Sequence, residues 1–341
     1  MQSEESSNPL IEFGKRARQA AETLSQTPTN TKRKALRAMA EALSGAESKL
    51  LEVNGTDVAA ARDSGMTRAL IDRLTLTPGR LEGMSRGLIK VAEQPDPVGQ
   101  VVEEWTRPNG LRITKVRVPM GVIAVIYEAR PNVTADVAGL CVMSGNAVIL
   151  RGSSQALQTN QAAVEVLARA AEDSGLPGNS IQLIEDSSRE SATQLMQLKG
   201  YVDLLIPRGG PALIASIYEN ATVPYIIDGD GNCHVYVDGS ADPKMATDIV
   251  VNAKTQRASV CNAAETLLVH EKLAESWLPG MLDELAELGV EVRGDENVCR
   301  VWPQAVPATE ADWGTEFLDL ILAVKVVPSL EEAISHVNQW G

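Results

Sequence analysis

The sequence predicts an α/β protein built on parallel sheets, and two observations lead to this fold class. From residue 119 onward, short apolar runs alternate with stretches in which apolar residues recur every three or four positions. The short runs are apolar throughout, which indicates strands buried on both faces. A repeated strand–helix unit of this kind is typical of a parallel sheet with helices on both sides.

The first ninety residues predict helices that precede the sheet. Apolar residues recur at helical spacing between residues 31 and 44, and Gly45 stands where this helix is expected to end. Further helices are expected at 50–62 and 78–92. Residues 101–118 differ, because two β-prone runs flank Arg107-Pro-Asn-Gly110, and Asn-Gly between such runs predicts a β-hairpin at about 100–118.

Two series of strands and helices follow the hairpin. The first has a helix at 154–174, which Gly175 and Pro177 terminate. Its expected strands are 122–126, 147–150, 181–184 and 202–206. The second series comprises a strand at 234–237, a helix at 243–255, a strand at 266–269, a helix at 271–288 and a strand at 320–327. We place the domain boundary near residue 235, which gives domains 1–235 and 236–341 and makes Gly229-Asp-Gly231 a turn between them.

Composition excludes several classes of protein. The 341 residues are 44 % hydrophobic, which argues against disorder, and no apolar run has the roughly 20 residues of a membrane span. The polar N-terminus lacks a signal-peptide core, so we expect a cytoplasmic protein. A net charge of −14 argues against a nucleic-acid partner. The basic run is interpreted as the polar face of a helix; it comprises Lys32, Arg33, Lys34 and Arg37.

The four cysteines and three histidines show no CxxC motif and no metal-ligand spacing, so neither disulfides nor a metal site is expected. Cys141 lies in an apolar helical stretch and is assigned to the core. Cys233 adjoins a strand and is interpreted as structural, and Cys299 lies in a polar stretch interpreted as irregular. Cys261 follows Lys254 and Arg257 in a loop, where nearby cations favour the nucleophilic thiolate.

Ligands of parallel sheets bind at the carboxyl ends of the strands, so the residues there are candidates for a cofactor site. A glycine pair between a strand and a helix lets backbone N–H groups approach a phosphate, although a tight turn with a surface arginine is an equal alternative here. The end of the second strand, at Arg151, has no carboxylate before Glu165, which favours NADP over NAD. The residues concerned are Arg151, Gly152, Ser153 and Ser154 after one strand and Arg208, Gly209 and Gly210 after another.

Several motifs in order resemble the aldehyde dehydrogenase superfamily, and within it the glutamate-5-semialdehyde dehydrogenase family. The resemblance runs from about residue 10 to the end of the chain. It rests on Pro119-Met-Gly-Val-Ile-Ala-Val-Ile126, Glu128-Ala-Arg-Pro-Asn-Val-Thr134, Ile149-Leu-Arg-Gly-Ser-Ser154, Leu205-Ile-Pro-Arg-Gly-Gly210, Asn252-Ala-Lys-Thr-Gln-Arg-Ala-Ser-Val-Cys-Asn-Ala263 and Glu316-Phe-Leu-Asp-Leu-Ile-Leu-Ala-Val-Lys325. It implies two Rossmann-like parallel-sheet domains with an N-terminal helical region and a β-hairpin.

The resemblance also implies roles for single residues. Cys261 matches the catalytic thiol, and Asn132 matches the amide that forms an oxyanion hole with the backbone N–H of Cys261. Residues 151–154 match the segment at the adenosine ribose, where Ser154 replaces the Glu of many NAD enzymes. Residues 208–210 match the turn at the pyrophosphate, and Glu316 matches the carboxylate at the nicotinamide ribose.

The implied activity is the NADPH-dependent reduction of L-glutamyl 5-phosphate to L-glutamate 5-semialdehyde through a Cys261 thioester, in proline biosynthesis. Arg130, Lys254 and Arg257 are candidates for binding the substrate carboxylate or phosphate, or else are surface charges. A link to glutamate 5-kinase is expected, because that class of enzyme makes the acyl phosphate. Two alternatives remain open: an aldehyde dehydrogenase that acylates coenzyme A, and a non-catalytic nucleotide-binding protein.

Three departures from the superfamily pattern matter. The hydrolytic Glu base is absent from residues 228–232, which favours a reductase that starts from an acyl phosphate. Ala258 and Ser259 replace the usual Pro-Gly pair before the thiol. The chain ends at Gly341 within a helix expected from about Leu330, whereas family members continue for several dozen residues. We therefore expect a truncated C-terminus, and a homo-oligomer if the full C-terminus is present.

Overall fold

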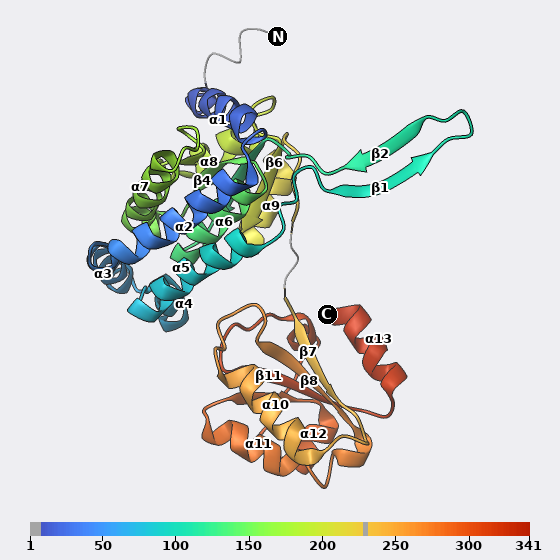
Figure 1. Cartoon of the computed structure of the whole chain (residues 1–341). Helices are drawn as coiled ribbons and strands as arrows, with labels where there is room; N and C mark the ends of the chain where they lie inside the picture. The colour runs from blue at the N-terminus through green and yellow to red at the C-terminus, as the bar shows by residue number, and fades with distance from the viewer. Residues whose placement is uncertain (1–7, 228–230) are drawn as a thin grey trace. The chain divides into compact units, whose positions relative to one another are not determined.

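The computed structural model describes residues 8–227 and 231–341 and divides into two compact units. The division falls between Asp228 and Gly229, whereas the sequence placed it near residue 235. Each unit contains its own parallel sheet, which confirms the predicted fold class (Figure 1). The expected turn at 229–231 lies, apart from Gly231, outside the described residues.

The first unit is built on four parallel strands in the order β5-β4-β3-β6. All six residues of β3 are buried, as expected for a strand covered on both faces. The chain starts in the middle of the sheet with β3, extends to one side with β4 and β5, and returns to the other side with β6. The order therefore reverses between β3 and β6, which is where ligands of such sheets bind. The strands are β3 (Val122–Tyr127), β4 (Ala147–Arg151), β5 (Ile181–Leu183) and β6 (Leu204–Arg208).

Helices cover this sheet and join it in one apolar core. The predicted helices at the N-terminus and at 154–174 are present, although a short 3₁₀ turn, η1 (Ser154–Ala156), precedes the second of them. Helices α1 and α4 were not placed individually from the sequence. The helices of this unit are α1 (Ile11–Leu24), α2 (Thr29–Gly45), α3 (Glu47–Asp63), α4 (Arg68–Leu74), α5 (Pro78–Glu93), α6 (Pro131–Met143), α7 (Leu157–Asp173), α8 (Arg189–Met196) and α9 (Pro211–Asn220).

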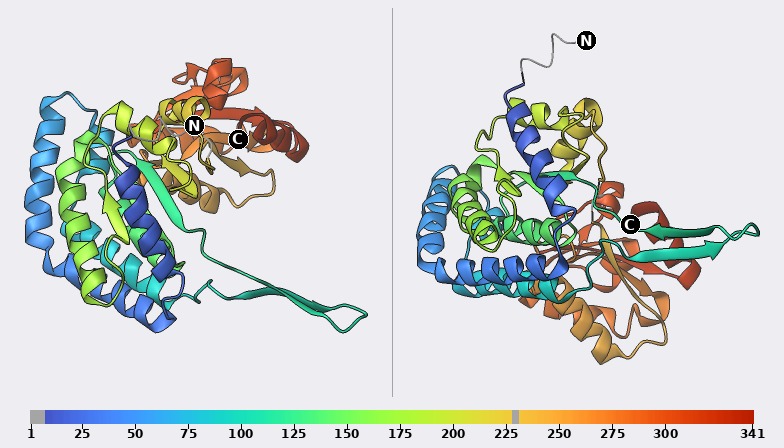
Figure 2. Two further views of the ribbon diagram at one scale, coloured as in Figure 1. Left: turned by 90° about the horizontal axis from the view of Figure 1, so that it is seen from above. Right: turned by 45° about the horizontal axis from the view of Figure 1, so that its top comes forward.

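The predicted hairpin is confirmed as β1 (Val101–Thr106) and β2 (Arg112–Val116), paired antiparallel. Gly110 adopts a φ of 86° in its turn, a left-handed conformation that glycine tolerates best. All residues of β1 are exposed. The hairpin extends away from the helices of its own unit in each view (Figures 1 and 2).

The second unit contains five parallel strands in the order β10-β9-β11-β8-β7. Alternate residues of β8 point to opposite faces: Leu267 and Val269 pack in one cluster with Leu282 of α11, and Leu268 packs in another with Ala333 of α13. The strands are β7 (Cys233–Val237), β8 (Ala264–His270), β9 (Glu291–Gly294), β10 (Val306–Pro307) and β11 (Ile321–Val327). The helical segments are α10 (Pro243–Thr255), η2 (Glu271–Leu273), α11 (Leu278–Glu287), α12 (Glu296–Val301), η3 (Glu310–Gly314) and α13 (Leu330–Trp340).

Two expectations for this unit are wrong in part. The helix expected at 271–288 is broken into η2 and α11, because Pro279 lacks an N–H and fits only the first turn of a helix. Cys299 does not lie in an irregular stretch but in α12, where its thiol donates to the carbonyl of Gly294 over 3.4 Å.

No helix among the described residues is both long and apolar enough to cross a membrane.

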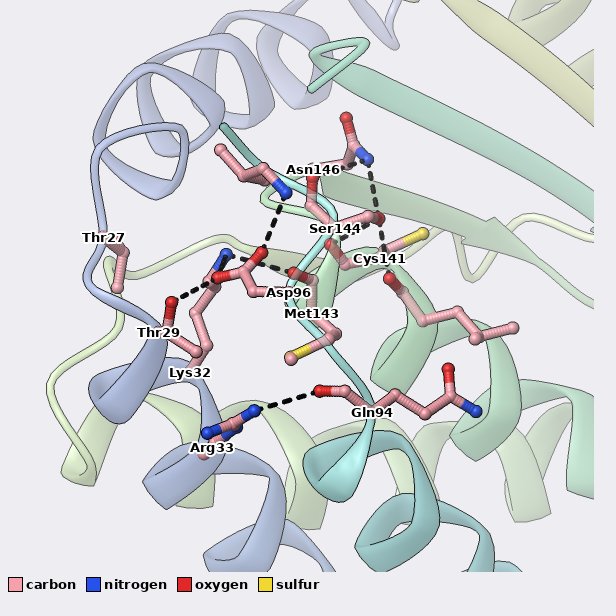
Figure 3. Close-up of polar contacts among 12 residues, drawn as sticks. Thr27, Thr29, Lys32, Arg33, Gln94, Asp96, Cys141, Met143, Ser144 and Asn146 are labelled. Carbon is pink, nitrogen blue, oxygen red and sulfur yellow. Dashed lines mark hydrogen bonds and ion pairs between the residues drawn. The ribbon is translucent and has the colours of Figure 1, made fainter. Parts of the chain in front are cut away.

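Lys32 corrects the interpretation of the basic run as a polar helix face. Lys34 and Arg37 are exposed on α2, but only 1 % of the Lys32 side chain is exposed. Its Nζ lies 2.6 Å from Oδ2 of Asp96 and donates to the carbonyl of Met143 over 3.1 Å (Figure 3). The ammonium is therefore paired and hydrogen-bonded, as a buried charge must be.

Asp96 is the other half of this pair. Burial on its own raises the pKa of the Asp96 carboxyl, but hydrogen bonds from Lys32, Thr29 and the backbone of Val98 outweigh burial and hold the pKa below its usual value. A lowered folded-state pKa makes the pair stabilising above the unfolded-state value of about 3.9. That contribution is lost as the pH falls through the folded-state pKa.

We predict that Lys32→Met lowers the free energy of unfolding by about 3 kcal/mol at neutral pH, because it leaves the Asp96 carboxylate without its counter-charge. A urea titration followed by circular dichroism measures this change. The control is Lys49→Met: Lys49 pairs with Glu165 at the surface with side chains 57 % and 67 % exposed, and the expected change is below about 1 kcal/mol. Equal effects of the two substitutions would contradict the assigned role of Lys32.

Candidate functional site

The glycine turn of the first unit lies between β6 and α9, next to the end of β3. Gly210 caps α9, and its N–H donates to Oε1 of Glu128 over 2.7 Å. A Cβ on Gly209 would lie 3.0 Å from Cγ and Oε1 of Glu128 and 2.9 Å from Leu213, so glycine permits this close approach. The turn thus accepts an anion, and the chain's own carboxylate takes that position.

Glu128 lies in one of the family motifs, but the sequence did not indicate a role for it. Two signals could have identified it: Glu128 directly follows an apolar strand, and the carboxyl ends of neighbouring parallel strands meet at one edge. β3 and β6 are neighbours, and Tyr127 pairs with Arg208 in their register. The backbone N–H of Glu128 also donates to the carbonyl of Arg208 over 3.1 Å. Glu128 therefore joins the two strands at the point where the strand order reverses.

The predicted ribose segment follows β4 at the same edge. Arg151 donates through Nη2 to the carbonyls of Ser187 and Ser188, over 2.5 and 2.7 Å. Its Nε and the hydroxyl of Ser153 are buried and have no hydrogen-bond partner among the described residues. Ser154 is exposed. Unsatisfied buried polar groups at a strand end fit a site that receives hydroxyl or phosphate groups of a ligand.

Asp186 is a carboxylate near Arg151 that the sequence did not indicate, because it lies after a different strand. It follows β5, the neighbour of β4, and it interacts with Arg151 electrostatically. Hydrogen bonds from Ser188 lower the pKa of the Asp186 carboxyl, with a smaller contribution from Arg151. Burial lowers the pKa of the Arg151 guanidinium, and Asp186 partly offsets this shift. The edge therefore contains a cation and a carboxylate side by side.

Asn132 lies in the first turn of α6, which Arg130 caps and Pro131 begins. The Asn132 side chain is exposed, and its Nδ2 donates to Oδ2 of Asp136 one turn later over 3.0 Å. Burial raises the pKa of Asp136, and the hydrogen bond from Asn132 partly opposes this shift. Asp136 thus fixes the direction of the amide, while Arg130 is half-buried beside it.

In the second unit, Cys261 is exposed on a turn between α10 and β8. The backbone N–H of Ala263 donates to the carbonyl of Val260 over 3.0 Å and closes the turn. Arg257 is exposed at the start of the same turn. The thiol is therefore accessible and carried by a fixed loop.

Cys233 and Glu316 lie close to this turn. The thiol of Cys233 donates to the backbone carbonyl of Cys261 over 3.3 Å. A Cβ on Gly231 would meet that carbonyl at 2.7 Å and Oε1 of Glu316 at 3.5 Å. Burial raises the pKa of the Cys233 thiol, and the charges of Cys261, Glu265 and Glu316 raise it further. We call Cys233, Cys261 and Glu316 the thiol cluster.

The thiol cluster lies at the amino ends of β7, β8 and β11, since Cys233 begins β7 and the other two residues precede β8 and β11. The expectation that functional residues lie at the carboxyl ends of the strands therefore does not hold for the thiol cluster. In this unit the structure brings Cys261 and Glu316 together. In the first unit it brings Arg151–Ser154, Arg208–Gly210, Arg130 and Asn132 to the carboxyl edge.

Lys254 does not occupy the substrate-facing position that the sequence suggested. Its side chain is fully buried; Nζ lies 2.7 Å from Oε2 of Glu265 and donates to the carbonyl of Ala264 over 2.9 Å. Oε1 of Glu265 accepts the N–H of Leu318 over 3.1 Å. Both charged groups of this pair are buried and hydrogen-bonded to protein, so Lys254 stabilises the thiol turn and does not face a substrate.

The structure also joins two histidines that stand far apart in the sequence. The rings of His234 in β7 and His336 in α13 lie 5.4 Å apart, and burial lowers the pKa of His336 to about 4. Asn232 donates to the carbonyls of Trp313 and Trp340 over 2.6 and 2.7 Å. These contacts attach α13 beside the thiol cluster. Within 8–227 and 231–341, no three His, Cys, Asp or Glu residues gather as a metal site.

Comparison with known proteins agrees with this arrangement of motifs. Residues 6–301 match the model of the aldehyde dehydrogenase family. The chain therefore belongs to the aldehyde dehydrogenase family, a family of oxidoreductases that use NAD or NADP.

Within this family the chain belongs with the γ-glutamyl phosphate reductases, which confirms the predicted resemblance. It is 55 % identical over 328 residues to the γ-glutamyl phosphate reductase of Moorella thermoacetica, covering 96 % of this chain and 78 % of the relative. The crystal structure of the Thermotoga maritima enzyme of that name superposes with a TM-score of 0.89 at 45 % identity, over 97 % of this chain and 80 % of the other. The crystal structure of the γ-glutamyl phosphate reductase of Saccharomyces cerevisiae superposes with a TM-score of 0.60 at 30 % identity, over 97 % of this chain and 83 % of the other.

We predict that Cys261 is alkylated before the other three cysteines, all of which lie in the described part of the chain. It is exposed, whereas Cys233 and Cys299 are half-buried and Cys141 is buried with its pKa raised to about 12. A short pulse of iodoacetamide on the folded protein, followed by peptide mass spectrometry, gives the order. Labelling of Cys299 ahead of Cys261 would contradict the exposed turn.

We predict that Lys254→Met lowers the free energy of unfolding of the second unit by about 3 kcal/mol, because Glu265 is left as an unpaired buried carboxylate. Tryptophan fluorescence reports on this unit, since four of the five tryptophans lie in it. The control is Lys244→Met on the same helix, where the pair with Asp248 is 84 % and 65 % exposed and little change is expected. An unchanged stability with a raised KM would restore Lys254 to the substrate site.

Proposed function

We propose that this chain reduces L-glutamyl 5-phosphate to L-glutamate 5-semialdehyde and phosphate with NADPH, through a thioester on Cys261. The observation that carries the proposal is the exposed Cys261 turn in a chain 55 % identical to a γ-glutamyl phosphate reductase. In that relative's name, the acyl phosphate is the group reduced. The proposal assigns the same substrate class to this chain.

In the first step, the Cys261 thiolate attacks the acyl carbon of the substrate. The carbon–sulfur bond forms, the bond from the acyl carbon to the phosphate oxygen breaks, and phosphate leaves with the electron pair. Phosphate is a good leaving group, so this step requires no strong general acid. The side-chain amide of Asn132 and the backbone N–H of Cys261 would donate to the oxyanion of the tetrahedral intermediate.

NADPH, when bound, supplies the hydride that reduces the thioester carbonyl. Hydride addition leaves a tetrahedral oxyanion on Cys261. When its carbon–oxygen double bond re-forms, the carbon–sulfur bond breaks, which releases the aldehyde and restores the Cys261 thiolate. Residues 228–232 contain no Glu to activate water against the thioester. The thioester therefore persists until reduction, as a reductase requires.

For the cofactor, we assign the adenosine ribose and its phosphate to the segment Arg151–Ser154. The unpartnered Nε of Arg151 and hydroxyl of Ser153 support this assignment. We assign the pyrophosphate to Arg208–Gly210, where the Gly210 N–H now bonded to Glu128 is the expected donor. Glu316 is assigned to the nicotinamide ribose. NADP is preferred over NAD, because Ser154 stands where a ribose-binding carboxylate would favour NAD.

Arg130 and Arg257 are the remaining candidates for the substrate's carboxylate and phosphate. Arg130 caps the helix that carries Asn132, and Arg257 begins the turn that carries Cys261. Acyl phosphates hydrolyse readily, so a kinase acting on the glutamate 5-carboxylate must supply the substrate close to the reductase. We further propose that the enzyme is a homo-oligomer with no nucleic-acid partner.

We predict that Cys261→Ser reduces turnover at least 10³-fold and that Asn132→Ala lowers kcat about 10²- to 10³-fold. The assay is phosphate-dependent NADP reduction with glutamate 5-semialdehyde, which runs the reaction in reverse. Arg112→Ala, on the exposed hairpin, is the matched surface control and should retain activity.

A parallel assay replaces phosphate by coenzyme A. Turnover that requires coenzyme A would identify the chain as an acylating aldehyde dehydrogenase. NADPH binding without turnover in either assay would leave a nucleotide-binding protein. Near-normal turnover of Cys261→Ser would rule out the covalent step.

A further inference from the structure

We propose that Cys233 and Cys261 form a reversible modification site: hydrogen peroxide oxidises the Cys261 thiol, and Cys233 then condenses with it to a disulfide. The linkage itself rests on geometry alone, whereas the resulting loss of turnover rests on the proposed function of Cys261.

The first observation is the contact between the two cysteines. The Sγ atom of Cys233 lies 3.3 Å from the backbone carbonyl oxygen of Cys261. A disulfide requires Cα atoms roughly 4.4–6.8 Å apart, and a side chain that already touches the partner's backbone satisfies the need for proximity. Rotation of the exposed Cys261 side chain is then the main movement required.

The backbone on both sides of the contact is fixed. Cys233 pairs with Ala264 in the parallel ladder, and the register is irregular immediately after Cys233. Gly231 approaches the Cys261 carbonyl so closely that a Cβ would lie 2.7 Å from it. Lys254 holds the other end of the turn through the carbonyl of Ala264. These contacts hold the backbones of the two cysteines next to each other in the folded unit.

Accessibility separates this pair from the other cysteines. Cys261 is exposed and Cys233 half-buried, so small oxidants reach the pair. Cys141 is buried in the core of the first unit, and the thiol of Cys299 donates to the carbonyl of Gly294 at the end of β9. The electrostatics also set the order of events, because the charge of Cys261 helps to keep the pKa of Cys233 raised. Cys233 therefore stays protonated, and the exposed Cys261 is the thiol that the oxidant meets first.

The chemistry balances with hydrogen peroxide as the oxidant. The Cys261 thiolate attacks one peroxide oxygen, the O–O bond breaks, and hydroxide leaves and becomes water, which gives a sulfenic acid. This removes the negative charge beside Cys233. Cys233 then loses its proton, its sulfur attacks the Cys261 sulfur, and the S–O bond breaks to release a second water. Each sulfur gives one electron, and thiol reductants reverse the reaction.

The test treats the purified full chain with equimolar hydrogen peroxide and digests it with trypsin without reduction. Trypsin places Cys233 in peptide 209–244 and Cys261 in peptide 258–272, each with a single cysteine. We expect these two peptides to be joined by mass, and dithiothreitol to separate them. Cys299→Ser, the matched control, should form the same link.

Cys233→Ser should show no link, and its Cys261 should accumulate sulfinic acid at least tenfold faster than in the unmodified chain. The wild-type measurement needs no variant, so a folding defect in Cys233→Ser leaves the test intact. Oxidised Cys261 without a link to Cys233, or links through Cys299 or between chains, would overturn the proposal. If the link forms but the chain does not turn over the acyl phosphate, the proposed function alone fails.

Discussion

The buried carboxylate of Glu265 determines the local structure around the Cys261 thiol. One of its oxygens pairs with Lys254 of α10, and the other accepts the N–H of Leu318 in the segment before β11. Lys254 also holds the carbonyl of Ala264, where β8 begins. The Cys261 turn and the Glu316 segment are thereby fixed to one buried group. Such a pair contributes little net free energy, because desolvation offsets its attraction; what it provides is position.

At the carboxyl edge of the first sheet a carboxylate of the chain also holds the backbone, but here it accepts from a helix start where a ligand is expected to bind. The N–H groups at the start of a helix need an acceptor, and Glu128 provides one for Gly210. A cofactor phosphate at this turn would exchange with a carboxylate and would leave no donor unsatisfied in either state. The affinity for a phosphate at this turn would therefore depend on how much more strongly the helix start binds the phosphate than the Glu128 carboxylate.

The sequence predicted those features that depend on local pattern. Apolar strands such as β3 are visible as unbroken runs, and the hairpin is visible from its Asn-Gly turn. Lys32 and Lys254 were misjudged, because the burial of a lysine depends on carboxylates that only the fold brings near, Asp96 and Glu265. β9 and β10 were missed because they are short and partly exposed.

The candidate site divides in the same way. Cys261 and Arg208–Gly210 could be singled out from loop context and glycine spacing, but the acceptor at that turn and the second thiol beside Cys261 could not. Cys233 belongs to a different strand, and the parallel ladder of β7 and β8 brings it to the thiol turn. The position of the thiol cluster at the amino ends of the strands also follows only from the topology. From the sequence, functional residues were expected at the carboxyl ends.

The proximity of two thiols raises the question of why only one of them should react with an acyl group. The answer lies in their surroundings: burial and the charges of Cys261, Glu265 and Glu316 all raise the pKa of Cys233. A protonated thiol is a poor nucleophile, so in the proposed reaction Cys233 would not compete with Cys261 for the substrate. Cys261 is exposed, as the proposed attack on an acyl phosphate requires, and the same exposure admits oxidants. The arrangement that would separate the two thiols in the proposed acyl transfer therefore also leaves Cys233 in place to react with an oxidised Cys261.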